Sequence, residues 1–179
     1  MRKYVLIALL VLMPSLAMAA PSEEDKLFAE LKQADSAETA KPIEAKLNDI
    51  FHISGSASVD LLMTRAGAAL GQADHATARK LVDAVTRIAP RYAEGWRMRA
   101  RMQQAASDDA GAMVSLERAV AANPRHFTAM AELAEMLEDY GDKPGALKLY
   151  RRALVLDPHL AVAVERVKAL TKEIEGQGI

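Results

Sequence analysis

The sequence predicts an all-α protein: a solenoid of antiparallel helical hairpins with an N-terminal capping hairpin and a C-terminal capping helix. Composition is the first reason, because 51% of the 179 residues are hydrophobic, only 4% are aromatic, and 35 are alanine. Alanine favours helices and forms strands poorly, which argues against β-sandwiches and β-barrels. A 34-residue period is the second reason, since it separates Pro90 from Pro124 and Pro124 from Pro158. Such a period is typical of repeat architectures.

Charge and cysteine content exclude several classes of function. The formal net charge is −1, which gives no electrostatic footprint for nucleic acid. The chain has no cysteine, so disulfides, thiolate catalysis, cysteine-based zinc sites and lipidation at cysteine are excluded. The fold must therefore be stabilised by packing alone.

The first residues have the pattern of a secretory signal peptide. A basic start, Met1–Lys3, precedes an unbroken apolar run, Tyr4–Met13, and Ala17 and Ala19 form an A-x-A cleavage site. The alternative is an uncleaved membrane anchor, but a spanning helix needs about 20 apolar residues, and the run is ten residues long. We therefore expect residues 1–19 to be removed after Ala19, no stable membrane insertion afterwards, and a periplasmic or secreted protein.

Three frames follow from the period, and they cover residues 59–92, 93–126 and 127–160. Small residues recur at the eighth, twentieth and twenty-seventh positions, where the two helices of a hairpin approach closely. Alanine fills eight of these nine positions, as Ala66, Ala78, Ala100, Ala112, Ala119, Ala134, Ala146 and Ala153, and Val85 fills the ninth. Aspartate stands at the sixteenth position of every frame, as Asp74, Asp108 and Asp142, and is predicted to cap the second helix. The proline near the end of each frame stops that helix.

This pattern of large apolar, small and proline positions resembles the tetratricopeptide repeat (TPR). Trp96 occupies an aromatic slot of the repeat, which favours a packing role. The segments Ser58–Met63, Ala93–Trp96 and Pro124–Phe127 also resemble small secreted TPR proteins of Gram-negative, mostly alphaproteobacterial, bacteria. This resemblance covers nearly the whole chain after the signal peptide and implies a helical solenoid that is exported from the cytoplasm.

Weaker units flank the three frames. Residues 23–52 are expected to form a degenerate N-terminal hairpin, with Phe28 and Leu31 at apolar repeat positions but Glu44 in a slot for a small residue. Residues 161–175 have the apolar and polar faces of a C-terminal capping helix.

The resemblance also implies where a partner binds, because positions two, five, nine, twelve and thirteen of a TPR line its concave groove. From these positions we predict a partner-binding set whose character changes from apolar to basic to acidic along the chain. The set is Met63, Leu70, Arg97, Arg101, Gln104, Glu135 and Glu138.

Two arginines at the centre of this set allow two interpretations. Arg97 and Arg101 lie one helical turn apart and could jointly face a ligand carboxylate. Alternatively, they pair with Glu135, Glu138 or Asp139 on the next first helix. The Lys/Asn set of a dedicated C-terminal-carboxylate clamp is absent, which disfavours binding of chaperone tails.

Arginines also occupy one repeat position where leucine is usual. These residues, Arg65 and Arg99, are predicted to be structural at the seam between hairpins, with ligand contact as the alternative.

The sequence offers no catalytic or metal-binding constellation. The four histidines, His52, His75, His126 and His159, have no metal-ligand spacing. The periodic methionines are expected to fill the core rather than bind a soft metal. No cofactor is therefore predicted, and the chain is not expected to be an enzyme.

Two functions remain open. The leading hypothesis is a non-catalytic adaptor or scaffold that binds a protein or peptide in its groove. The alternative is a structural or assembly factor of the cell envelope that acts by self-association along the capping hairpin. The sequence permits homo-oligomers but does not indicate them.

Overall fold

A computed structural model of the chain describes residues 20–176, and the predicted signal peptide, residues 1–19, lies outside this range. Within it the protein is all-helical, without strands, as the sequence predicts. The helices are α1 (Glu23–Gln33), α2 (Ala37–Phe51), α3 (Ala57–Gly71), α4 (His75–Ile88), α5 (Ala93–Ala105), α6 (Asp109–Ala122), α7 (Phe127–Asp139), α8 (Lys143–Leu156) and α9 (Ala161–Gly176).

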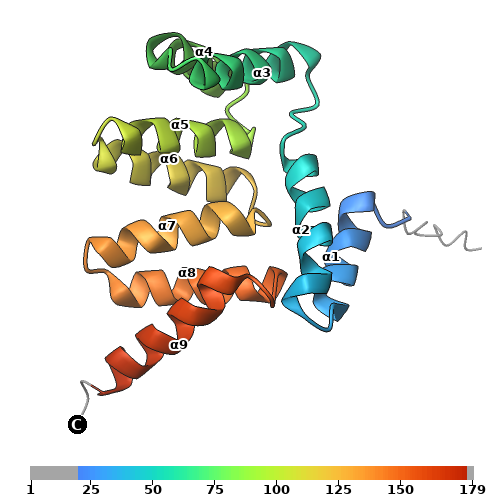
Figure 1. The fold of residues 1–179 in the computed structure, drawn as a ribbon, viewed down its shortest axis with the longest axis vertical. Coiled ribbons are helices and arrows are strands. Elements are labelled where there is room, and N and C mark those ends of the chain that lie inside the picture. Colours follow the sequence, from blue (N-terminus) through green and yellow to red (C-terminus); the bar gives the residue numbers. More distant parts are fainter. Residues whose placement is uncertain (1–19, 177–179) are drawn as a thin grey trace, which may run out of the picture.

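Helices α3 to α8 form three antiparallel hairpins that stack one on another (Figure 1). The first helices α5 and α7 begin at Ala93 and Phe127, the first residues of their frames, whereas α3 begins at Ala57, two residues before its frame. Helix α9 packs on α8 and ends the stack.

The residues that recur every 34 positions are buried, cap a helix or follow a helix end, as their positions predict. All nine residues of the small-residue slots are fully buried, with 0% exposure. The side chains of Asp74, Asp108 and Asp142 each accept a hydrogen bond from the backbone N–H three residues on, which caps α4, α6 and α8. Each repeat proline follows the C-cap residue of its helix: Pro90, Pro124 and Pro158 come after α4, α6 and α8.

The tight slots predict a large effect of added volume. Ala112 is fully buried on α6, so Ala112→Leu should lower the free energy of unfolding by about 1–3 kcal/mol through overpacking. Ala110, two residues earlier on α6, is exposed, and Ala110→Leu should change the same quantity by no more than about 0.5 kcal/mol. Urea denaturation of both variants measures the difference, and equal values would show that the slot is not tight.

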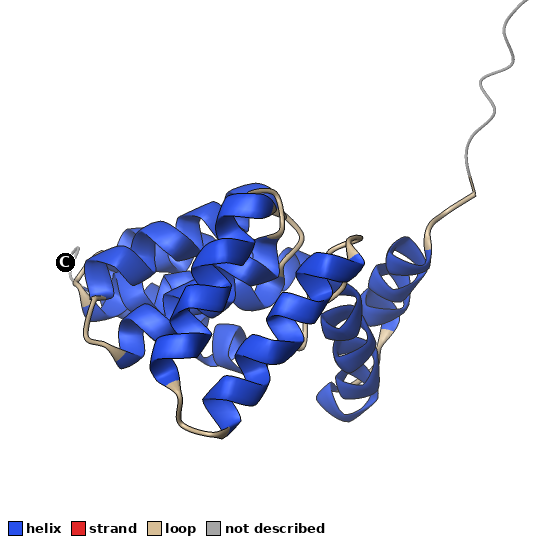
Figure 2. Cartoon of the chain, turned by 90° about the horizontal axis from the view of Figure 1, so that it is seen from above, coloured by secondary structure: helices blue, strands red, loops and turns tan. Residues whose placement is uncertain are grey.

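The N-terminal hairpin does not cap the end of the stack at α3. Instead of continuing the stack beyond α3, α1 and α2 lie beside it, and α2 runs across the ends of the repeat helices (Figures 1 and 2). Aromatic contacts attach it there, because the rings of Phe28 and Phe51 lie 6.3 and 5.8 Å from the ring of Phe127 at the start of α7. Glu44, which occupies a small-residue slot in the extended frame, instead faces Asp157 in the turn after α8.

Candidate binding groove

Helix α2 and the connector after it contact the second position of all three first helices. The backbone N–H of Ser54 donates to the Asp60 carboxylate at 2.9 Å. Further along the stack, His52 Nε2 lies 3.4 Å from Glu94 Oε1, and the Thr128 hydroxyl donates to the Asn48 side-chain oxygen at 3.2 Å. Helix α2 therefore runs antiparallel to the order of the repeats. It covers the half of the predicted groove that is formed by the N-terminal halves of the first helices α3, α5 and α7.

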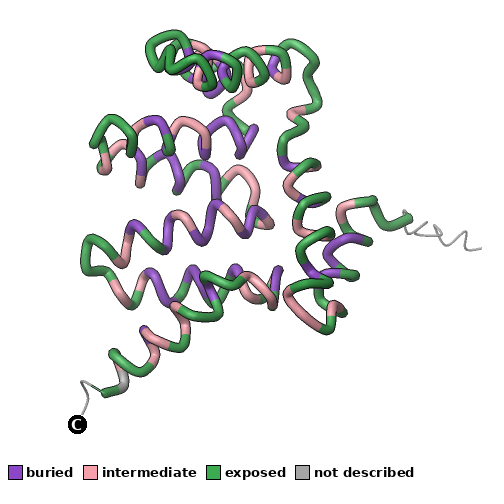
Figure 3. The backbone as a smooth tube through the Cα atoms, in the orientation of Figure 1, coloured by how far each residue is buried: buried purple, intermediate pink, exposed green. Residues whose placement is uncertain are grey.

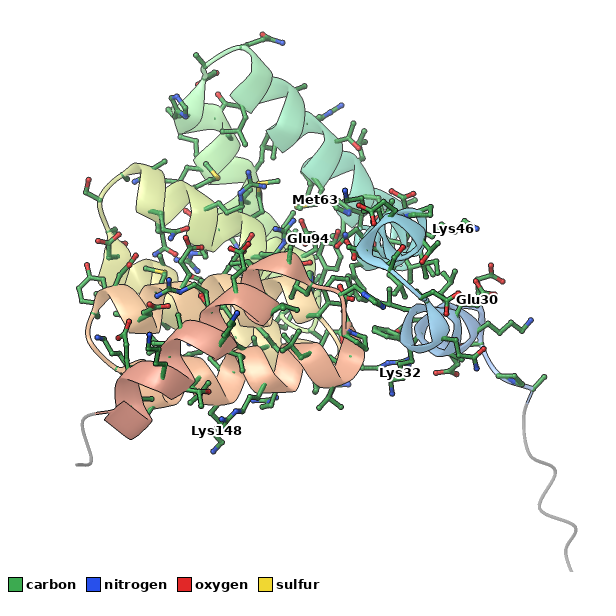
Figure 4. All side chains as sticks on the ribbon, turned by 60° about the horizontal axis from the view of Figure 1, so that its bottom comes forward. Glu30, Lys32, Lys46, Met63, Glu94 and Lys148 are labelled. Carbon is green, nitrogen blue, oxygen red and sulfur yellow. The ribbon has the colours of Figure 1, made fainter. Side chains whose placement is uncertain are left out.

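Glu94 is the centre of a buried polar network beneath this cover. It is 1% exposed and lies where α5 meets the end of α2 (Figure 4). The Arg97 side chain donates to both Glu94 carboxylate oxygens, at 2.7 and 2.9 Å. His126 Nδ1 accepts from the Ala129 N–H, so its Nε2–H is the donor to Glu94, at 3.1 Å.

The network makes Glu94 a permanent carboxylate. Burial by itself raises the pKa of Glu94, but the hydrogen bonds from His126 and Arg97 outweigh burial and lower this pKa to about 2. The same pairing raises the pKa of Arg97 despite its burial. Both groups are therefore charged throughout the physiological range of pH.

Arg97 does not lie open in the groove as expected. It is 9% exposed, and its remaining Nη1 donates to Glu132 at 2.7 Å. The alternative prediction is that Arg97 pairs with Glu135, Glu138 or Asp139. Its partners in the structure are instead Glu94 and Glu132. A joint clamp of Arg97 and Arg101 on a ligand carboxylate is therefore not present in this structure.

The C-terminal halves of the first helices form the open half of the groove, which comprises positions nine, twelve and thirteen of each frame. Exposure gathers at the helix ends farthest from α2 (Figure 3). Of the predicted partner-binding set, Arg101, Gln104 and Glu135 are exposed there, and Leu70 and Glu138 are half-buried. Met63, at position five, is half-buried nearer to α2.

The open half carries a charge gradient. The first hairpin contributes Leu70 and two glycines, the second contributes Arg101, and the third contributes Glu135, Glu138 and Asp139. Glu138 is paired with Arg166 of α9, whose Nε donates to it at 2.9 Å. The predicted order of apolar, basic and acidic residues along the groove is therefore present only in its open half.

Leu70 and Arg101 border a pocket of about 300 Å³ in this open half. Met102 is the buried side chain of its lining, and Leu70 and Met98 are half-buried. The exposed side chains His75, Arg79 and Arg101 surround this apolar part. No acidic residue lines the pocket.

A second cluster of titratable groups holds the hairpin at the other end of the stack. Asp157 is fully buried in the turn after α8, and its Oδ2 has no hydrogen-bond partner among the described residues. Burial raises the pKa of Asp157 against the opposing hydrogen bond from the His159 backbone. Burial and the nearby Asp157 charge also raise the pKa of Glu44 on α2. The His159 ring Nε2–H donates to the Ala34 carbonyl oxygen at 2.7 Å.

This carboxyl pair predicts a pH dependence of stability. A carboxyl group whose pKa is raised by folding stabilises the fold below its unfolded pKa, and this contribution is lost as pH rises through the folded pKa. Glu44→Gln keeps the neutral form at every pH. The variant should therefore unfold at higher urea than the wild type at pH 8, and the difference should shrink towards pH 4, below the ordinary value of 4.5.

Glu38→Gln is the matched control, because Glu38 lies exposed on the same helix. Its difference from the wild type should not widen with pH in the same titration series. If Glu44→Gln behaved like Glu38→Gln, the proximity of Glu44 to Asp157 would have no energetic effect.

Other residues singled out in the sequence have structural surroundings. Arg99 pairs with Asp83 of the preceding hairpin at 3.3 Å, which is the seam contact predicted for it. Its guanidinium also lies 5.5 Å from the Trp96 ring centroid, and the Trp96 Nε1–H donates to the Pro90 carbonyl oxygen at 2.9 Å. Arg65 is exposed on α3.

Sequence reasoning missed the contribution of the histidines. The sequence assigns no role to His126 and His159 beyond the lack of metal-ligand spacing, whereas the rings of both contact the hairpin: His126 stacks on Phe51 with 4.4 Å between ring centroids, and His159 bonds to Ala34. The only available signal was their recurrence in successive inter-repeat turns. In the described part of the chain, no group of three or more histidine or acidic residues is arranged to hold a metal ion.

None of the helices in residues 20–176 combines the length and the hydropathy needed to cross a membrane. No family model matches the sequence. A TPR repeat-containing protein of Rhizobium etli is 29% identical over 161 residues, which are 89% of this chain and 79% of that protein.

Solved structures share the fold. The Sgt2 TPR domain from Aspergillus fumigatus is similar with a TM-score of 0.59 and 20% identity, over 69% of this chain and 83% of that domain. The type III secretion chaperone SycD of Yersinia enterocolitica, in complex with a peptide of the translocator YopD, has a TM-score of 0.59 and 14% identity, over 66% of this chain and 95% of its own. These similarities confirm the predicted helical-hairpin solenoid.

Proposed function

Because the chain has a tetratricopeptide-repeat fold, we propose that it is a non-catalytic adaptor or scaffold that binds a segment of another protein in the open half of its groove. The observation that carries the proposal is the contrast between the two halves. Glu94 and Arg97 are buried and paired with each other, whereas Arg101 and Gln104, on the same helix, are exposed. A preformed groove of this kind binds an extended segment without a large cost of ordering the protein.

Export is part of the proposal. The basic start, apolar run and A-x-A site of residues 1–19 support a signal peptide cut after Ala19 and a periplasmic or secreted protein. Intact-mass measurement of the protein from the periplasmic fraction tests this, and a chain that retains residues 1–19 would contradict it.

A position-specific cross-link tests the groove. A photoreactive amino acid at position 104, in the open half, should capture a defined partner in cells, and Arg101→Glu should abolish the capture. The same amino acid in place of Glu117, which is exposed on α6, is the control and should not capture that partner. Capture of the same proteins from both positions, or unchanged capture in the Arg101→Glu variant, would overturn the groove as the binding site.

Self-association along the N-terminal hairpin is the alternative function. Its aromatic side chains Phe28 and Phe51 already pack on Phe127 of the same chain, which favours the adaptor. Light scattering over a range of concentrations distinguishes the two, because a monomer throughout would contradict assembly by self-association.

A further inference from the structure

We infer that the pocket between the first two hairpins recognises an acidic peptide segment with an apolar anchor, and that the segment continues into basic residues towards the third hairpin. This inference rests on the proposed function and adds the chemistry and the direction of the ligand. Its basis is the pocket that Leu70, Met98 and Met102 share with His75, Arg79 and Arg101.

The apolar part of the pocket calls for one aliphatic side chain. Its volume of about 300 Å³ is at the lower end of the range of small-ligand sites, and it holds a side chain rather than a folded element. Met98 and Met102 are flexible thioethers that adapt to differently branched side chains. Burial of an aliphatic side chain here supplies affinity without a unique shape.

The charged part calls for a carboxylate beside that anchor. Within the described residues, the guanidinium groups of Arg79 and Arg101 make no ion pair and are free to face a ligand, whereas those of Arg97, Arg99, Arg125 and Arg166 are paired with carboxylates. Two cations that converge on an apolar pocket without an acidic lining residue are complementary to a carboxylate. They disfavour a basic segment at the same place.

The direction follows from the charge gradient. Glu135 and Asp139 are exposed in the open half on the third hairpin and make no ion pair among the described residues. They repel a ligand that is acidic along its whole length and attract lysine or arginine. Because the other half of the groove is covered by α2, the ligand must lie along the open half. A ligand fits there when its acidic residues face the first two hairpins and its basic residues face the third, and the opposite order does not fit.

Two peptides of identical composition test the order of charges by fluorescence anisotropy with the purified protein. The first is fluorescein-labelled Glu-Leu-Asp-Gly-Ser-Lys-Lys, and the second exchanges the charged ends, as Lys-Leu-Lys-Gly-Ser-Glu-Asp. In either chain direction the second peptide places lysines instead of carboxylates beside the leucine, so it should bind more weakly than the first, and equal affinity would contradict the inference. Each peptide is also made with the label at the opposite end, which detects contacts of the fluorophore itself. A third peptide replaces leucine with serine and tests the anchor.

We expect the Arg101→Glu and Arg79→Glu variants each to weaken binding of the first peptide by about tenfold, as loss of one charge-assisted contact predicts. The serine peptide should bind at least about tenfold more weakly to the wild type. Arg118→Glu is the control, since Arg118 is exposed on α6 outside the pocket, and it should leave binding unchanged.

A further variant tests the direction of the ligand. The double variant Glu135→Lys/Asp139→Lys should weaken binding of the first peptide. It should strengthen binding of a fully acidic peptide, in which glutamate replaces both lysines of the first. Equal affinity for the fully acidic peptide before and after this change would overturn the proposed direction, and unchanged binding in both arginine variants would overturn the pocket. A partner captured at position 104 together with such unchanged binding would refute the ligand chemistry and leave the adaptor function standing.

Discussion

Replacing Arg97 with methionine should lower the free energy of unfolding by about 3–5 kcal/mol, because it leaves the buried Glu94 carboxylate without its main cation. Arg97 donates two hydrogen bonds to Glu94 and one to Glu132 from a position that is 9% exposed. Without Arg97, burial acts to raise the pKa of Glu94, so the loss consists of an uncompensated buried charge or of the free energy needed to protonate the carboxyl group. Urea denaturation at neutral pH measures the loss.

Arg101→Met is the matched control, one turn further along α5. Arg101 is exposed and makes no ion pair among the described residues, so this variant should stay within about 0.5 kcal/mol of the wild type. The double variant Glu94→Leu/Arg97→Met should recover part of the lost stability, since an apolar pair leaves no unpaired charge on these two residues. A double variant less stable than Arg97→Met alone would contradict this account of the network.

Phe127→Ala should lower the free energy of unfolding by about 3–5 kcal/mol, because it removes the ring on which the N-terminal hairpin rests. Phe127 is 1% exposed, and its ring packs against Phe28 and Phe51 of the two hairpin helices. The loss should be accompanied by release of the hairpin, so that limited proteolysis cuts the connector, residues 53–56, faster than in the wild type.

Tyr140→Ala provides the comparison, since Tyr140 is an aromatic residue at the end of α7 that is 58% exposed. It should cost under about 1 kcal/mol and leave the rate of cleavage in the connector unchanged. If Phe127→Ala destabilised the protein without faster cleavage, the ring would support the stack but not the docking of the hairpin.

The repeat architecture could be predicted because its causes are local in sequence. A hairpin needs small residues where its two helices meet, a cap at the start of the second helix and a stop at its end, and each requirement recurs every 34 residues. Ala112, Asp108 and Pro124 show all three in one repeat, and the structure places them as the pattern predicts.

The position of the N-terminal hairpin could not be predicted, because it depends on contacts between segments far apart in the chain. Asn48 and Thr128 are 80 residues apart, and no periodicity links them. The same limit applies to Arg97: its repeat position indicates the groove, but its burial comes from its partners Glu94 and Glu132 and from the hairpin above them. Glu44 in a slot for a small residue was the one local sign that the hairpin would not stack as a repeat.

The transverse course of α2 also changes the way in which the solenoid is expected to lose structure. In a simple repeat array each unit touches only its neighbours, so unfolding spreads one repeat at a time from either end. Here Asn48, His52 and Ser54 fasten one segment to three successive units, and Ala34 reaches the turn before α9. The buried side chains of the hairpin also form one hydrophobic cluster with those of the second and third units, whereas those of α3 and α4 lie in separate clusters. We therefore expect the hairpin and the second and third units to unfold together, and fraying to start at α3 and α4.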